Sequence, residues 1–153
     1  MLLTMFCMAF IALLIFIALT DVNTRRIPNA AVVALLAVAL LIQALNTLGS
    51  DAHVALPGIV QSLICAAIVL VLGVLFEMLW RKFKGGAHGL GMGDIKLSAA
   101  SALVLGWYDF PCIALACIVA AVVESLRGNK TFAFGPYLCA TFSICFLYLA
   151  FLA

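Results

Sequence analysis

Long runs of apolar residues, separated by short polar links, follow one another along the whole chain. Runs of about 17–25 apolar residues are typical of helices that span a bilayer. Strand-like alternation of apolar and polar residues is absent from the sequence. The runs predict an all-α integral membrane protein with six transmembrane helices, over Leu2–Thr20, Ala30–Leu48, Gly58–Trp80, Asp94–Tyr108, Phe110–Leu126 and Phe132–Ala153.

The fourth predicted helix, Asp94–Tyr108, is the shortest of the six. Its 15 residues rise about 22 Å, whereas the hydrocarbon core of a bilayer is about 30 Å thick. Either the bilayer thins around this segment, or the chain enters as non-helical backbone, which is tolerated only where it lines a polar cavity.

The composition agrees with a membrane protein. Apolar residues make up 68% of the chain and charged residues only 9%, against roughly 25% charged residues in a soluble domain. A net charge of +2 is too small for a nucleic-acid interface. The sequence therefore predicts one membrane-embedded domain over residues 1–153, which contacts the lipid bilayer and no nucleic acid.

All eight basic residues are predicted to lie on one side of the membrane. They follow the first, third and fifth predicted helices or begin the fourth, at Arg25, Arg26, Arg81, Lys82, Lys84, Lys96, Arg127 and Lys130. Because cytoplasmic loops carry the excess of Lys and Arg, this side is predicted to be cytoplasmic. Both termini are then expected on the non-cytoplasmic side.

A glycine-rich stretch leads into the short fourth helix. Gly85–Asp94 contains five glycines and ends in an ionisable residue, which is costly to place near a bilayer. Asp94 is a good N-cap residue, but capping does not require five glycines. Since glycine permits left-handed backbone and close approach of another chain, we interpret the stretch as a flexible segment that presents the Asp94 carboxylate at the membrane edge.

Asp21, which follows the first predicted helix, is expected on the same side of the membrane as Asp94. Taken alone, Asp21 is more simply explained as a solvated residue at a helix end. Taken together, two carboxyl groups that share a site do not both ionise cheaply, so one keeps a proton. The charged one accepts a proton from an attacking water and the protonated one donates to the oxyanion. This is the minimum equipment of an aspartic protease, which needs no cofactor and no metal.

Two further acids stand near basic residues on the predicted cytoplasmic side. Glu77 precedes Arg81 by four residues, and Glu124 precedes Arg127 by three. These are spacings at which helical side chains pair. Ion pairs at the membrane interface are therefore the preferred interpretation of both glutamates.

Three other residues near the predicted helix ends are candidates for a role at the site. Gly135 and Pro136 fall near the start of the sixth predicted helix, where a helix-breaking pair is expected to cause a kink. Lys96 comes two residues after Asp94 and so does not share its helical face. We expect the lysine to reach the lipid headgroups, with steering of the electrostatics of the site as its alternative role.

Three blocks of the sequence resemble those of the type IV prepilin peptidases, membrane aspartic proteases of the GxGD class. The first block is Asp21–Asn29, an aspartate followed by Ile-Pro-Asn. The second is Gly91–Leu97, which matches GxGDxKL, and the third is Phe134–Leu138, which resembles the family's PFGPxL with Ala133 in place of proline. Because the blocks occur in the family's order, the resemblance covers essentially the whole chain.

The resemblance implies specific roles for these residues. Asp21 and Asp94 would be the catalytic pair that cuts the short basic leader from prepilins at the cytoplasmic face of the bacterial inner membrane. Glu77 and Glu124 would supply acidic contacts to the leader. The substrate would bind through its leader peptide and its apolar N-terminal helix. An active-site loop region would include Gly91, Gly93, Lys96, Gly135 and Pro136.

The sequence also differs from larger members of that family. Bifunctional members carry a cysteine-containing cytoplasmic region that is associated with N-methylation, and this chain has no CxxC pair. We therefore expect peptidase activity without methyltransferase activity, as in the compact form that serves Flp/Tad-type pili. The sequence leaves open which prepilin is cut and whether the protein dimerises.

Three other functions compete with this interpretation. Presenilin-like proteases share Gly-Xaa-Gly-Asp, but they use Tyr-Asp and Pro-Ala-Leu where this chain has Thr20-Asp21 and Phe134-Gly135-Pro136. A small proton-coupled transporter would use the same two carboxylates, although transporter sites are typically near the bilayer midplane. A purely structural subunit would leave the two acids and the glycine stretch without a purpose.

Overall fold

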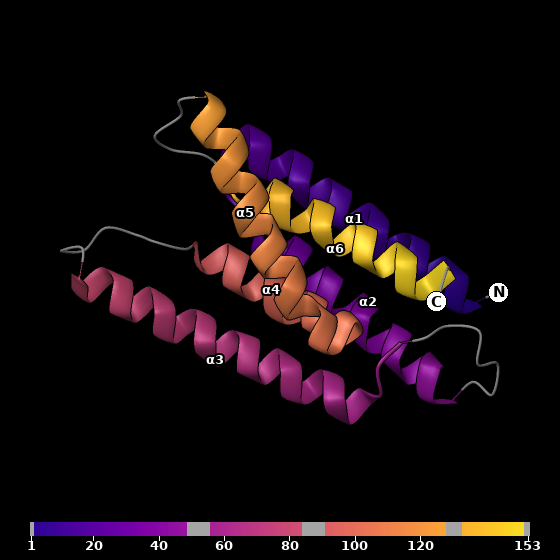
Figure 1. Ribbon diagram of the computed structural model, residues 1–153. Coiled ribbons are helices and arrows are strands. Elements are labelled where there is room, and N and C mark those ends of the chain that lie inside the picture. Colours follow the sequence, from indigo (N-terminus) through magenta and orange to yellow (C-terminus); the bar gives the residue numbers. More distant parts are fainter. Residues whose placement is uncertain (1, 49–55, 84–90, 128–132, 152–153) are drawn as a thin grey trace.

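Residues 2–48, 56–83, 91–127 and 133–151 are described by a computed structural model, and their regular structure is entirely helical (Figure 1). The remaining residues, which include most of the glycine-rich stretch, lie outside the described part. In chain order, the elements are α1 (Leu2–Thr24), α2 (Asn29–Leu48), α3 (Ile59–Phe83), α4 (Met92–Leu105), the short 3-10 helix η1 (Gly106–Tyr108), α5 (Asp109–Arg127) and α6 (Gly135–Phe151).

Each predicted apolar run overlaps one α-helix of the structure, but two boundaries differ in ways that affect the site. α1 continues to Thr24, so Asp21 lies inside the helix rather than after it. α6 begins at Gly135, so the expected kink is wrong and the Gly135-Pro136 pair starts the helix instead. Proline is tolerated there because N–H groups in the first turn have no helical acceptor.

Among the described residues, four stretches are long and apolar enough to cross a membrane: α1, α2, α3 and the stretch Met92–Arg127, which contains α4, η1 and α5. A fifth apolar helix, Gly135–Ala150, is shorter. Large apolar side chains also cover the outer surface, among them Leu19, Val33, Leu63, Ile118 and Ile144. Length, composition and apolar outer faces therefore identify a multi-pass membrane protein.

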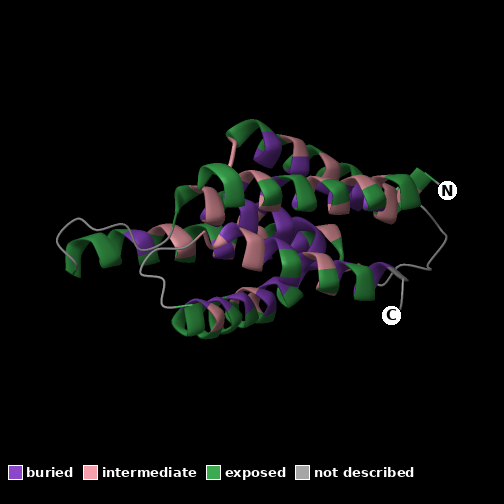
Figure 2. Cartoon of the chain, turned by 90° about the horizontal axis from the view of Figure 1, so that it is seen from above, coloured by how far each residue is buried: buried purple, intermediate pink, exposed green. Residues whose placement is uncertain are grey.

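The shortest of these helices, α4, lies at the centre of the molecule. Nine of its 14 residues are buried, and it packs against α2, α3, α5 and α6. Figure 2 shows the buried residues gathered in the middle, with exposed residues on the outer faces. α4 is helical from Met92, so non-helical entry of this segment is wrong for the described residues. Because protein surrounds α4, its length is not required to match the bilayer.

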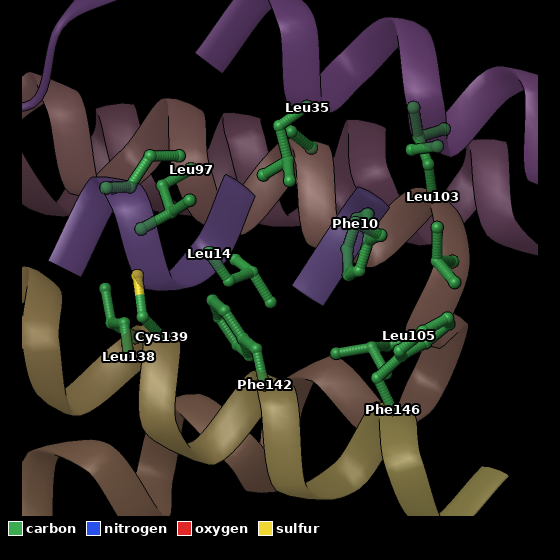
Figure 3. Packing of buried hydrophobic residues seen from close by; sticks show 14 of the residues in the cluster. Phe10, Leu14, Leu35, Leu97, Leu103, Leu105, Leu138, Cys139, Phe142 and Phe146 are labelled. Atoms are coloured by element: carbon green, nitrogen blue, oxygen red, sulfur yellow. The ribbon is translucent and has the colours of Figure 1, made fainter. Parts of the chain in front are cut away.

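The seam between α1 and α6 brings one predicted site residue into the interior. Buried residues of α1 recur every three or four positions, which places them on one helical face: Cys7, Phe10, Leu14, Ile17 and Asp21. Figure 3 shows Phe10 and Leu14 facing Phe142 and Phe146 of α6. The rings of Phe10 and Phe146 are 4.9 Å apart between centroids. The apolar stripe of α1 therefore ends in a carboxylate that faces the beginning of α6.

Candidate active site

Asp21 is held by the first backbone amide of α6. The Asp21 side chain is buried, with only 5% of the residue exposed. The N–H of Gly135 donates a hydrogen bond to Asp21 Oδ2, with N and O 3.1 Å apart. The first N–H groups of a helix lack an acceptor within the helix and carry its positive dipole end. A carboxylate from α1 thus fills the position of a capping side chain at the start of α6.

This contact depends on the absence of a side chain at Gly135. A Cβ added at this position would lie 2.6 Å from Asp21 Oδ2 and 3.1 Å from Asp21 Cγ. Both distances are shorter than an ordinary van der Waals contact, so either the carboxylate or the helix would have to move. The glycine of the third sequence block therefore has a steric role in holding Asp21.

Asp94 lies in the first turn of α4 and is stabilised in a similar way. Its carboxylate folds back toward Gly91, with whose backbone N–H it interacts, while the Asp94 N–H donates to Gly91 O at 3.0 Å. An acid in the first helical turn that reaches back to the N-cap amide forms half of a capping box. A Cβ at Gly91 would lie 2.9 Å from Asp94 Oδ2, so glycine is required here as well.

Gly93 brings the start of α4 against the link between α1 and α2. A Cβ at Gly93 would lie 3.0 Å from the Cβ of Ile27, the residue that precedes Pro28. The two glycines of the Gly-Xaa-Gly-Asp block thus have separate functions. Gly91 makes room for the carboxylate, and Gly93 makes room for a residue of the first sequence block. Close backbone approach of this kind is a common reason for glycine in a helix.

These contacts bring Asp21 and Asp94 close together, an arrangement that the sequence leaves open. The two carboxylates are close enough for their charges to interact, and both also act on the buried thiol of Cys139 in α6. Asp94 is half-buried, whereas Asp21 is buried. The pair therefore combines one enclosed acid and one that is partly open to the surroundings, close enough for the charge of each to act on the other.

Lys96 lies beside the site and outside the pair. Its Nζ donates to Oδ1 of Asn29, the first residue of α2, at 3.2 Å, and the contact is exposed. As predicted from their spacing, Lys96 and Asp94 are not on the same helical face. The lysine connects α4 to the end of the first sequence block, a contact that the sequence analysis did not anticipate.

The two glutamates form the ion pairs that their spacing predicts. Arg81 Nε lies 2.7 Å from Glu77 Oε1, and Arg127 Nη1 lies 3.5 Å from Glu124 Oε1. Both carboxylates are almost fully buried although they are near helix ends. Glu124 also accepts a hydrogen bond from the hydroxyl of Tyr137 in α6.

Tyr137 is the residue of the site region that the sequence analysis missed. Tyr137 belongs to the third sequence block, and this membership was the one signal that could have identified it. Nothing in the local spacing indicates that α6 contacts Glu124. Its hydroxyl fastens the first turn of α6 to α5, while Gly135 fastens the same turn to α1. The start of α6 is therefore held from two sides.

The geometry fits general acid–base chemistry on a peptide bond. Two neighbouring carboxyl groups provide one proton acceptor and one proton donor once they share a proton. Backbone amides at the starts of two helices hold the carboxylates in position. The site therefore spends no free energy on ordering these side chains during a reaction. The described residues place this pair at the end of the bundle opposite the two termini (Figure 1).

Comparison with known proteins gives a family match that extends over most of the chain. The sequence profile of the type IV leader peptidase family matches residues 8–126. The prepilin leader peptidase/N-methyltransferases of Burkholderia pseudomallei strains 1026b and K96243 are each 38% identical to it over 94 residues. The alignments cover 54% of this chain but only 30% of each relative. No solved structure gives a significant match.

Proposed function

Because this chain belongs to the type IV leader peptidase family, we propose that it is a membrane aspartic endopeptidase. It removes the short basic leader from type IV, Flp-like prepilins and uses Asp21 and Asp94 to activate water. The observation that carries the proposal is the meeting of these two acids, 73 positions apart in the sequence, at the starts of α4 and α6.

The reaction follows from two carboxyl groups that share one proton. The charged carboxylate removes a proton from water as the water oxygen attacks the scissile carbonyl carbon. The protonated carboxyl donates to the carbonyl oxygen as its negative charge develops. When the tetrahedral intermediate collapses, the leaving amine takes up a proton and the shared proton of the acid pair is restored. No cofactor takes part.

Gly91, Gly93, Gly135, Pro136 and Lys96 support this pair. Gly91 and Gly135 leave room for the carboxylates, Gly93 lets α4 approach the α1–α2 link, and Pro136 favours a helix start at this point. Lys96 joins α4 to α2 through Asn29. Rigid positioning of this kind matters because a misplacement of about 1 Å costs on the order of 100-fold in rate.

In the membrane, six helices cross the bacterial inner membrane and the acid pair faces the cytoplasm. The basic residues at the ends of α1, α3 and α5 support this orientation, and it leaves both termini on the non-cytoplasmic side. The prepilin meets the site with its basic leader in the cytoplasm and its apolar helix in the bilayer. Glu77 and Glu124 lie near helix ends on the same side, and we assign them as acidic contacts for the leader that exchange their arginine partners for its basic residues.

The test compares cleavage of a candidate prepilin in membranes by wild type, Asp21→Asn and Asp94→Asn, with expression and insertion verified for each. Asparagine keeps the shape of the side chain but removes the titrating group, so both variants should lose cleavage by about 10²–10⁴-fold. Full cleavage by either inserted variant would exclude that aspartate from the mechanism. A wild-type chain that cuts none of several prepilins would favour the transporter alternative.

A further inference from the structure

An apolar cavity lies against α4 on the side of α3 and α5. It has a volume of about 280 Å³. Its walls come from α3 and α5, its floor from α4, and one end from the residue before α6: Val69, Leu72, Gly73, Phe76, Ile95, Ser98, Phe110, Ile113, Cys117 and Phe134. In Figure 1, α4 lies between α3 and α5 at the end that carries the site. The cavity is therefore a lateral recess rather than part of the acid pair.

The face of α4 that carries Asp94 continues into this cavity. Ser98, which lines the floor, comes four residues after Asp94 and so lies one turn further along the same face. Ile95 adjoins Asp94 in sequence, and Phe134 adjoins Gly135, the residue whose amide holds Asp21. Asp94 is thus one residue away, along the chain, from a side chain that lines the cavity, and so is Gly135, which holds Asp21.

A second apolar recess, on the opposite side of α4, lacks this relation to the site. It has a volume of about 510 Å³ and lies among α2, α3 and α4. Its α4 residues include Lys96, Ala99 and Leu103, which belong to a different helical face from Asp94. The larger recess therefore provides a natural control for the smaller one.

The buried carboxylate of Glu77 lies next to the smaller cavity, on the wall that α3 forms. Glu77 comes four residues after Gly73, so it lies one turn further toward the site end on the same face. The Glu77 side chain is 3% exposed, whereas its partner Arg81 is 46% exposed. A carboxylate buried this deeply needs a cation beside it, since loss of its partner would leave an uncompensated buried charge. A cation that arrives along the cavity can supply this charge in place of the exposed Arg81.

These features define the chemistry of one occupant. A polypeptide that is cut at the acid pair and continues into the bilayer has to be helical and apolar there, because lipid satisfies no backbone polar groups. Such a helix binds by inserting large apolar side chains from one face into a recess. Glu77 lies at the end of the α3 wall that is nearer the acid pair, and its negative charge complements a basic segment that precedes this helix.

We propose that the recess between α3 and α5, with α4 as its floor, seats the apolar helix of the substrate directly behind the scissile bond, with the basic segment beside Glu77. This inference rests on the proposed function and specifies how that function selects its substrate. The substrate helix lies along the Asp94 face of α4, and the peptide bond that precedes the helix comes to rest at the acid pair.

The first experiment fills each recess with a bulky side chain. Cys117 on α5 lines the proposed recess and Ala67 on α3 lines the other; both are small and exposed. Cys117→Trp should raise KM for a prepilin about tenfold or more, since displacing one large apolar side chain costs roughly 1.5–3 kcal/mol. Its kcat should stay within about threefold of wild type. Ala67→Trp should behave as wild type. Unchanged KM in Cys117→Trp, or a raised KM in Ala67→Trp alone, would overturn the assignment.

The second experiment identifies the occupant directly. A photoreactive benzoylphenylalanine is placed at position 117, and in a matched variant at position 67, in membrane vesicles that contain full-length prepilin. Adducts between position 117 and the apolar segment of the prepilin are expected, with few from position 67. Adducts at position 117 that contain phospholipid alone would show a lipid site and overturn the proposal.

The role of the charge is tested with Glu77→Gln and two substrates. KM should rise about tenfold for a prepilin with a basic leader and stay unchanged when glutamines replace its basic residues. An equal effect on both substrates would remove Glu77 from recognition. Failure of the proposed function and failure of the recess assignment give different results. If the proposed function is wrong, the wild type does not cleave prepilin at all. If only the recess assignment is wrong, the wild type and Cys117→Trp cleave equally well.

Discussion

The two ends of the helix bundle each contain buried acid, but they hold it in different ways. At one end, Asp21 and Asp94 lie close together, and backbone amides at helix starts hold them. At the other end, Asp109 is the first residue of α5 and is fully buried, at 0% exposed. Its Oδ1 accepts a hydrogen bond from Ser101 of α4 at 2.7 Å.

The end near Asp109 is a sealed polar cluster. Asp109 Oδ2 has no hydrogen-bond partner among the described residues. Nearby in the fold, Gln43 Nε2 donates to Leu103 O at 2.7 Å, to Ser62 Oγ at 3.0 Å and to Pro57 O at 3.2 Å. These bonds join α2, the start of α3 and the end of α4. Buried polar networks of this kind specify how helices pack.

The comparison separates two kinds of surroundings for a buried carboxyl group. Asp109 is more deeply buried than either acid of the pair, yet it faces a hydroxyl rather than a second acid. Asp94 has both a neighbouring carboxylate and partial access to the surroundings. Proton exchange with water and substrate requires both conditions, so we assign catalysis to one end and stabilisation to the other.

The strongest test of this comparison changes one carboxyl group to an amide at each end. Asp94→Asn should lower kcat for prepilin cleavage by about 10²–10⁴-fold. Asp109→Asn should cleave within about threefold of wild type, because Ser101 can donate to the amide oxygen as it does to the carboxylate. Equal loss in both inserted variants would show that the two ends are not functionally distinct.

A methyl group added at Gly135 should have the next largest effect. The new Cβ would meet Asp21 Oδ2 at 2.6 Å, so we expect Gly135→Ala to lower kcat by about 10–100-fold through misplacement of the acid. Gly58→Ala is the matched control, since a Cβ there meets nothing within 4 Å. Steady-state cleavage by the two variants, at equal amounts of inserted protein, checks this expectation.

At the sealed end, a substitution should affect stability more than rate. Gln43→Leu keeps a similar volume but leaves the carbonyl of Leu103 and the hydroxyl of Ser62 without this donor. The expected cost is about 1–3 kcal/mol of unfolding free energy, seen as a lower midpoint of thermal unfolding in detergent. Cleavage at low temperature should stay near the wild-type rate; a large loss of kcat without loss of stability would contradict the division between the two ends.

The smallest effect is expected from Lys96. Its contact with Asn29 is exposed and 3.2 Å long, and exposed polar contacts contribute about 0–1 kcal/mol. Lys96→Met should therefore change kcat/KM by less than about fivefold. A loss as large as that of Asp94→Asn would place the ammonium group in the chemistry.

Much of the site follows from local sequence. The glutamate–arginine pairs follow from their spacing of three or four residues. The three sequence blocks name both acids and the glycines around them. Helical periodicity and side-chain chemistry are local properties, so a sequence is enough to read them. Only the structure shows which face of α1 is buried and that Asp21 lies on it, because apolar residues cover nearly the whole surface of this helix.

The tertiary structure decided how these parts meet. The hydrogen bond from Gly135 to Asp21 joins residues 114 positions apart, and the contact between Gly93 and Ile27 sets where α4 begins relative to α1. Tyr137 reaches Glu124 from another helix, and Asp109 is sealed in the interior beside Ser101. None of these contacts leaves a periodic signal, because each depends on the relative placement of helices that pack through residues distant in sequence. The sequence determined which carboxyl groups are available, and the packing around α4 determined which two of them share a site.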